Sequence, residues 1–136
     1  MPRLLLDTNV IIRFLTGDHP THSPRSRKLF KRAAAGEVVL VLTDLTIAEA
    51  AWVLDSFYGF DRSEIGAALQ GVVDSTGIEV QNRPILVTAL RTFMRGEADF
   101  VDAYHAAMAA NEPIAIASFD RDFDRFADVK RVDPQS

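Results

Sequence analysis

Short apolar runs alternate with longer amphipathic segments along this chain of 136 residues, and this alternation constrains the fold more than any other feature. Each run has the length and the leucine-rich or β-branched composition of a buried strand. We expect strands over residues 4–6, 38–42, 78–80 and 114–118, and a last short one over 129–132. Strands that alternate with helices are typical of an α/β domain with a parallel sheet.

The segments between these runs are predicted to be helices, because glycine or proline stands near most of their ends. We expect helices over residues 10–15, 24–35, 44–58, 61–75, 84–94 and 99–110, and a helical turn over 122–126. The sequence shows no internal repeat and no linker, so we expect one domain over residues 1–136. The predicted fold is a parallel, twisted sheet of four to five strands with helices on both faces.

The composition is that of an ordinary folded protein, with 48% hydrophobic and 25% charged residues. The chain has no cysteine, which excludes disulfides and thiolate metal sites. No apolar stretch approaches the roughly 20 residues that cross a bilayer, and no basic and apolar leader precedes Arg3. We therefore expect a cytoplasmic protein with no membrane partner.

Basic residues gather in one segment, although the net charge of the chain is −4. The group is Arg25, Arg27, Lys28, Lys31 and Arg32. Arginine, the main basic residue of the chain, binds phosphate through two parallel hydrogen bonds. Together with Arg13, the residues Arg25, Arg27 and Lys28 are candidates for contacts to the phosphates of a nucleic acid. The same pattern equally fits the solvated face of a helix, and the sequence leaves this alternative open.

Acidic residues follow three of the predicted strands directly. They are Asp7, Asp44 and Asp120. Ligands of open parallel sheets bind beyond the carboxyl ends of the strands, which lie along one edge. The helices add Glu49 and the pair Asp99 and Asp102, whose spacing of three residues places them on one helix face.

Each of these acids, taken alone, also has a purely structural interpretation. Aspartate is a favoured helix cap, so Asp7, Asp99 and Asp120 could each start a helix. The segment from Thr46 to Glu49 matches a capping box. Asp61 has the same kind of spacing without any suspected chemistry, and so serves as an internal control.

Several carboxylates at one edge of a sheet would repel one another unless a cation neutralised them. Mg²⁺ or Mn²⁺ suits such an oxygen-only site, whereas zinc usually takes histidine or cysteine. The histidines, His19, His22 and His105, show no zinc-like spacing. His105 follows Asp102 by three residues and could reach the site, although a packed or partly exposed histidine explains it better.

Four segments in this order resemble the PIN-domain family, and within it the VapC-type ribonuclease toxins of bacterial toxin–antitoxin pairs. They are Leu5-Leu6-Asp7-Thr8-Asn9, Ala48-Glu49-Ala50, Asp99-Phe100-Val101-Asp102-Ala103 and Ser118-Phe119-Asp120-Arg121-Asp122-Phe123. The resemblance implies an acidic quartet that binds Mg²⁺ or Mn²⁺, formed by Asp7, Glu49, Asp102 and Asp120. It implies supporting roles for Asp99 and Asp122, and for Ser118 and Asn9 beside the first carboxylate.

The activity that this resemblance implies is hydrolysis of an RNA phosphodiester by a metal-activated water. The family also implies a homodimer and a cognate antitoxin that docks near the acidic groove. Apolar surface for such contacts is available at Trp52, Phe57 and Phe60, although these side chains could instead belong to the hydrophobic core.

Two other classes of protein remain open at this point. A phosphoacceptor receiver domain also gathers acids at strand ends, but it needs a lysine near its last strand, where only the poorly placed Lys130 is available. A non-catalytic PIN-like module that binds RNA or protein would be expected to lack at least one acid of the quartet.

Overall fold

The computed structural model describes residues 1–135. Strands β1 (Arg3–Leu5), β2 (Val39–Leu42) and β3 (Ile78–Val80) form one parallel sheet in the order β1-β2-β3. Leu4 lies opposite Leu40, which lies opposite Ile78. This sheet confirms the predicted α/β class and the predicted parallel pairing.

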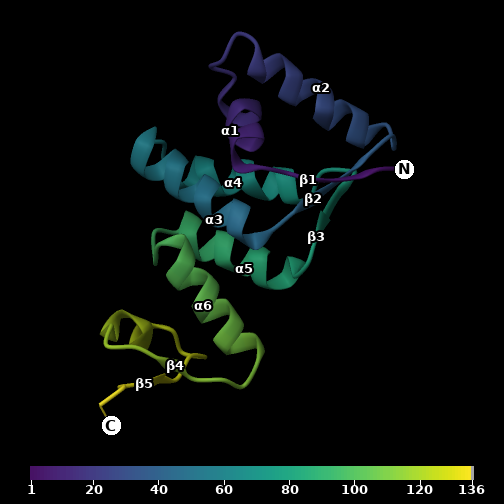
Figure 1. The fold of residues 1–136 in the computed structure, drawn as a ribbon. Helices are drawn as coiled ribbons and strands as arrows, with labels where there is room; N and C mark the ends of the chain where they lie inside the picture. The colour runs from purple at the N-terminus through teal and green to yellow at the C-terminus, as the bar shows by residue number, and fades with distance from the viewer. Residues whose placement is uncertain (136) are drawn as a thin grey trace.

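Helices surround the sheet. They are α1 (Thr8–Thr16), α2 (His22–Ala34), α3 (Asp44–Trp52), α4 (Arg62–Val73), α5 (Arg83–Met94) and α6 (Phe100–Asn111). In Figure 1, α1 and α2 lie above the sheet, and α5 and α6 lie below it. Each of the six corresponds to a predicted helix, with ends that differ by a few residues.

The core lies between the sheet and the helices. Leu40 and Leu42 of β2 are fully buried because β2 is the central strand. Ile47, Leu69 and Leu90 bring α3, α4 and α5 onto the same core with no exposed surface. Burial of such side chains contributes about 1.5–3 kcal/mol each and holds the helices in place.

The helix predicted over residues 44–58 changes character after Trp52. It continues as the π-helical turn η1 (Val53–Phe57), in which the Tyr58 N–H donates to the Val53 carbonyl at 3.1 Å. Its start also differs from the predicted capping box. Thr43 is the N-cap and accepts from the Thr46 N–H at 3.3 Å, so Thr46 itself is not the cap.

The last two strands form a separate sheet, which corrects the predicted single sheet of four to five strands. β4 (Ile116–Ala117) and β5 (Arg131–Val132) pair in parallel with each other only, and the 3₁₀ helix η2 (Arg121–Arg125) lies between them in sequence. Figure 1 shows this pair beyond α6, at the opposite end of the molecule from β1–β3. Buried Phe123 and a hydrogen bond from Arg125 to the Glu97 carbonyl hold it there.

Candidate functional site: two groups of acidic residues

The first acidic group consists of Asp7 and Glu49, which line the same hollow of about 340 Å³. Asp7 follows β1 and takes the N-cap position of α1, and Glu49 projects from α3. Both residues are exposed. Asn9, at the start of α1, lines the hollow beside Asp7. The hollow thus joins the end of the first strand to the third helix.

The acids at helix starts differ in whether their side chains cap the helix. The control residue Asp61 caps α4, and its side chain accepts from the Ser63 N–H at 3.1 Å. Asp120 likewise accepts from the Asp122 N–H at 2.9 Å. Asp7 and Asp99 occupy cap positions without a side-chain capping bond. Capping therefore leaves the Asp7 carboxylate free for other chemistry.

The second acidic group lies at the start of α6. Asp99, Asp102, Asp120 and Asp122 line one hollow of about 220 Å³. Burial raises the pKa of Asp102, and the negative charges of Asp120 and Asp99 raise it further. The C-terminal segment thus brings Asp120 and Asp122 into the same hollow as Asp102.

Arg62 contributes a positive charge at this second group, and nothing in the sequence singled it out. Its guanidinium forms ion pairs with Asp99 and, at 3.1 Å, with Asp55. It also donates to the Ala98 carbonyl at 3.3 Å and lies 4.8 Å from the ring centre of Phe93. Asp99 is thereby engaged by Arg62, which fits a supporting rather than a ligating role.

The two groups do not merge into one metal site within a single chain. Among residues 1–135, no three histidine, aspartate or glutamate side chains are grouped so that they could hold one ion. Trp52 lines both the hollow of Asp7 and Glu49 and a neighbouring hollow that contains Asp102. The donors have the right chemistry for Mg²⁺ or Mn²⁺, but their arrangement in one copy does not fit the ion.

Ser118 makes a different contact from the one expected. Its Oγ accepts from the Asp120 N–H at 2.9 Å, whereas the family resemblance implies a hydrogen bond to the first carboxylate, that of Asp7. The reason is topological, because Ser118 follows β4, which pairs with β5 and not with β1. Ser118 therefore orients the backbone of Asp120 in this structure.

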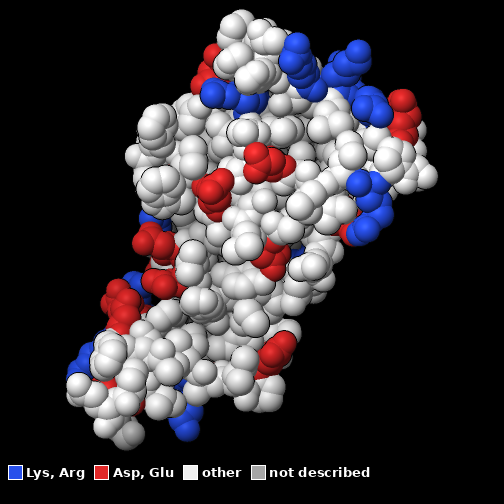
Figure 2. All heavy atoms as spheres, in the orientation of Figure 1, with Lys and Arg blue, Asp and Glu red and all other residues white. Residues whose placement is uncertain are grey.

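The basic residues lie next to the first acidic group. Asn9 and Arg13 line both the hollow of Asp7 and a second hollow of about 460 Å³ that contains Arg25. Arg27 and Lys28 are exposed on α2. Figure 2 shows basic side chains along α2 at the top of the molecule, with acidic side chains below them. A positive surface thus adjoins the hollow of Asp7 and Glu49.

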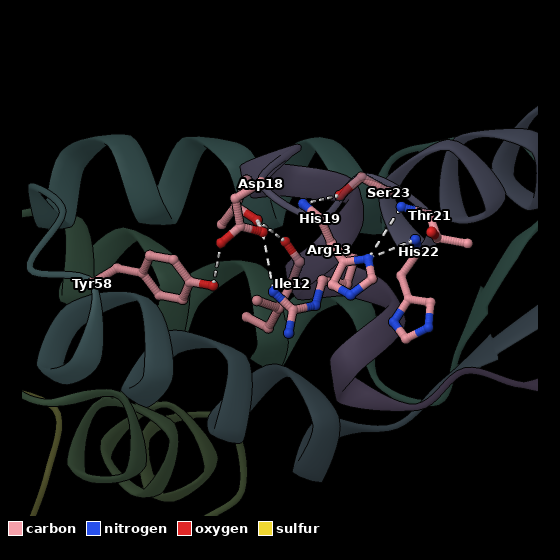
Figure 3. A network of polar contacts seen from close by, with 9 residues as sticks. Ile12, Arg13, Asp18, His19, Thr21, His22, Ser23 and Tyr58 are labelled. Carbon is pink, nitrogen blue, oxygen red and sulfur yellow. Dashed lines mark hydrogen bonds and ion pairs between the residues drawn. The ribbon is translucent and has the colours of Figure 1, made fainter.

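Arg13 is partly neutralised by a polar network shown in Figure 3. Its guanidinium pairs with Asp18 at 3.1 Å. Asp18 also accepts from the hydroxyls of Thr16 at 2.6 Å and Tyr58 at 2.9 Å. The hydrogen bonds from Thr16 and Tyr58 lower the pKa of Asp18 to about 2. Arg13 is therefore positioned by this network beside the hollow that it lines.

The histidines take up structural or exposed positions. The Nδ1 atom of His19 accepts from the backbone N–H groups of Thr21 and His22, and the two imidazole rings stack with centroids 4.0 Å apart (Figure 3). His105 is exposed on α6. Among residues 1–135 none of them belongs to a cluster of metal-binding side chains.

Asp44, the acid after the second strand, belongs to a buried contact instead of either acidic group. The Tyr104 hydroxyl donates to Asp44 Oδ2 and links α6 to the start of α3. Burial and then this hydrogen bond raise the pKa of Tyr104 to about 12. The other oxygen, Oδ1, is buried without a hydrogen-bond partner among the described residues.

Comparison with known proteins identifies the family to which this chain belongs. Residues 4–129 match the family model of the PIN domain, and the chain belongs to the PIN domain family. The chain is similar to a VapC ribonuclease of Aquifex aeolicus, with 24% identity over 96% of both chains. It is also similar to ribonuclease VapC31 of Mycobacterium tuberculosis, with 28% identity over 96% of this chain and 97% of the relative.

Proposed function

We propose that this protein is a ribonuclease of the VapC type, the toxin of a toxin–antitoxin pair. The observation that carries the proposal is the PIN-domain match over residues 4–129, together with relatives named VapC ribonucleases that align over nearly their whole length. The whole chain, residues 1–136, then acts as one PIN domain. Its catalytic residues are Asp7, Glu49, Asp102 and Asp120.

The surface beside Asp7 supports RNA as the substrate. A phosphodiester backbone needs positive charge along its path, and base-independent binding comes mostly from such contacts. Such positive charge lies on α2, at Arg25, Arg27 and Lys28. Arg13 lines both the hollow that contains Arg25 and the hollow of Asp7 and Glu49. RNA laid along α2 would reach Asp7 and Glu49 at the end of the sheet.

We propose Mg²⁺ or Mn²⁺ as the cofactor, because the candidate donors are carboxylates and contain no histidine or cysteine. Within residues 1–135 the acids of one copy do not gather around one ion, so the proposal names the donors and routes no catalytic step through the metal. Asp99 and Asp122 remain supporting residues in this proposal, as do Asn9 beside Asp7 and Ser118 beside the backbone of Asp120.

The apolar surface beside the first hollow supports an antitoxin as the protein partner. Trp52 is 64% exposed and Phe57 is 81% exposed, and both line the hollow of Asp7 and Glu49. An exposed apolar patch at a polar groove is typical of a protein interaction site. We propose that the antitoxin covers these side chains and thereby blocks the acids.

We also propose that the protein acts in the cytoplasm and that it does so as a homodimer. No helix within residues 1–135 has the length and hydropathy needed to span a membrane.

The decisive test is RNA cleavage in the presence of Mn²⁺ or Mg²⁺, comparing the wild type with Asp7→Asn. We expect the substitution to lower the rate by more than about 100-fold, since even partners that only support metal ligands are worth about 10- to 100-fold. Asp61→Asn is the matched control, because Asp61 is a cap of similar exposure with no place in the site.

Equal rates for the wild type and Asp7→Asn would overturn the ribonuclease proposal. Binding of RNA without cleavage would instead support the non-catalytic PIN-like module. The receiver-domain alternative has no support from the family match. A phosphoryl group that can be transferred to an aspartate of the chain would revive it.

A further inference from the structure

Strand β1 has a free edge on the side away from β2. The Val39 N–H donates to the Pro2 carbonyl and the Leu6 N–H donates to the Val41 carbonyl, each at 2.9 Å. Backbone groups of alternate residues in a strand point to opposite sides, so those of Arg3 and Leu5 point outward. In residues 1–135 no strand pairs with this side of β1. The edge is therefore open to another strand.

The side chains of β1 are exposed in a way that its sequence does not predict. Three successive leucines are typical of a strand covered on both faces. Leu6 is buried, yet Leu5 is 74% exposed and Leu4 is 39% exposed. An open, apolar strand edge invites pairing with another chain. The sequence and the free edge thus indicate the same missing neighbour.

Strand β4 has a matching free edge. The Ile116 N–H donates to the Lys130 carbonyl at 2.8 Å, and the Ser118 N–H donates to the Val132 carbonyl at 3.1 Å. The backbone groups of Ala117 therefore point away from β5. Phe119 is 68% exposed and Ile114 is 51% exposed beside this edge. An isolated two-stranded sheet is only marginally stable in water, so β4 also lacks a neighbour.

We propose that β1 of one copy pairs in parallel with β4 of a second copy, and that the exchange is reciprocal. Each half of the dimer then contains one continuous sheet in the order β3-β2-β1-β4-β5, with its last two strands supplied by the other chain. Reciprocal exchange gives a closed dimer with twofold symmetry, in which both free edges of both copies are used. The exposed leucines of β1 and the exposed Phe119 and Ile114 are covered together.

The second copy is a better occupant than the same chain's own β4. Figure 1 places β4 and β5 at the opposite end of the molecule from β1, with α5 and α6 between them. Buried Phe123 and the bond from Arg125 to the Glu97 carbonyl keep the pair there. Folding back onto β1 of the same chain would break these contacts, whereas a second copy can dock without breaking them.

The exchange also accounts for the division of the acidic residues, a consequence that rests on the proposed function. Asp7 follows β1 and Asp120 follows β4, so pairing of these strands brings both to one edge of the combined sheet. Asp102 lines the same hollow as Asp120, so the exchange brings both residues of one copy to Asp7 of the other. Asp7 and Glu49 of one copy then face Asp102 and Asp120 of the other, and the quartet is complete only in the dimer.

Cross-linking tests the exchange independently of any enzymatic activity. The chain has no cysteine, so introduced thiols are the only ones present. Chains carrying Leu5→Cys and chains carrying Ala117→Cys, with different tags, are co-expressed and treated with a short thiol-to-thiol cross-linker. We expect covalent dimers that contain both tags. Leu5→Cys combined with Ala67→Cys, on the exposed surface of α4, is the matched control and should give none.

The double variant Leu5→Cys/Ala117→Cys separates the two possible occupants of β1. Linked dimers support exchange between copies. A monomer with a link inside one chain would overturn the proposal, and so would the absence of any link between the two strands.

A charge on the free edge tests the same contact without cysteines. Leu5→Lys places a lysine at a position that is 74% exposed, so the fold of one copy tolerates it, but it opposes strand pairing. Light scattering is expected to show a shift from the mass of two chains to that of one. Leu45→Lys, at an 82% exposed position of α3, is the control and should stay dimeric. A wild type that is monomeric at micromolar concentration would refute the exchange.

Complementation tests the shared active site. In a mixed dimer of Asp7→Asn and Asp120→Asn chains, one site carries both substitutions and the other carries neither. Doubly tagged mixed dimers should therefore cleave RNA at about half the wild-type rate, while either variant alone is inactive. Inactive mixed dimers would contradict the shared site. A wild type without cleavage would refute the proposed function and leave the cross-linking result to judge the exchange.

Discussion

The chain as far as the first half of α6 and the segment after α6 differ sharply in how they bury their apolar residues. The core cluster extends from Leu6 to Ala103 and includes residues from β2 and from α1 to α6. After Ala109, Phe123 is the one buried hydrophobic side chain within the described residues. Yet both parts carry apolar strand sequences of the same kind, as residues 4–6 and 114–118 show.

This difference teaches that an apolar strand sequence becomes core only where the surrounding structure covers it. β2 has β1 and β3 beside it, and Leu40 and Leu42 are fully buried. β1 and β4 each lack one neighbour, and Leu5, Ile114 and Phe119 remain exposed. In the proposed dimer, β1 and β4 of different copies are each other's missing neighbour. The exposed apolar side chains of both regions are then covered.

The largest expected effect on stability separates the two regions directly. Leu40→Ala removes a fully buried side chain from the central strand and should lower the free energy of unfolding by about 2–5 kcal/mol. Ile114→Ala, at a 51% exposed position, should change it by less than about 0.5 kcal/mol in the monomer. Urea unfolding at high dilution, where the chain is monomeric, measures both. Similar losses for the two variants would show that the C-terminal segment belongs to the core of one copy.

A smaller effect is expected at the contact that fastens α6 to the first region. Tyr104→Phe removes the donor to Asp44 Oδ2 and leaves a carboxylate with both oxygens unpaired, at a cost of about 1–3 kcal/mol. Tyr58→Phe, which removes a hydrogen bond to the exposed Asp18, is the comparison and should cost less. Thermal unfolding curves of the two variants give the order, and a larger loss for Tyr58→Phe would contradict this account of α6.

The smallest effect concerns the pH dependence of the network around Asp18. The pKa of Asp18 falls to about 2 in the folded chain, below its ordinary value of 3.8. A carboxyl group with a lowered folded-state pKa stabilises the fold above its unfolded-state pKa, and this contribution is lost as the pH falls through the folded-state value. Between about pH 4 and pH 2, the melting temperature of the wild type should therefore decline more steeply than that of Asp18→Asn. Parallel curves for the two proteins would exclude the network as a source of acid sensitivity.

The sequence alone was enough to predict most helices and strands and the carboxylate chemistry of the candidate site. Glycine and proline mark the helix ends, and the apolar runs mark the strands, because these signals act through backbone conformation and local burial. The acids could be picked out as a group since they follow strands or share a helix face. Their order along the chain was enough to indicate the PIN-domain family, which the family match then showed.

Other features depended on contacts between residues far apart in the chain. Arg62 reaches Asp99 across 37 positions, and Tyr104 reaches Asp44 across 60, and no local pattern predicts either contact. The division of the strands into two sheets was equally invisible, because an apolar run specifies that a strand needs neighbours without specifying which ones. The pairing of β4 and β5 depends on where α6 leads the chain and on the contacts that hold Phe123 and Arg125 beside the start of α6. Only the tertiary structure, therefore, showed that Asp7 and Asp120 lie in separate groups within one copy.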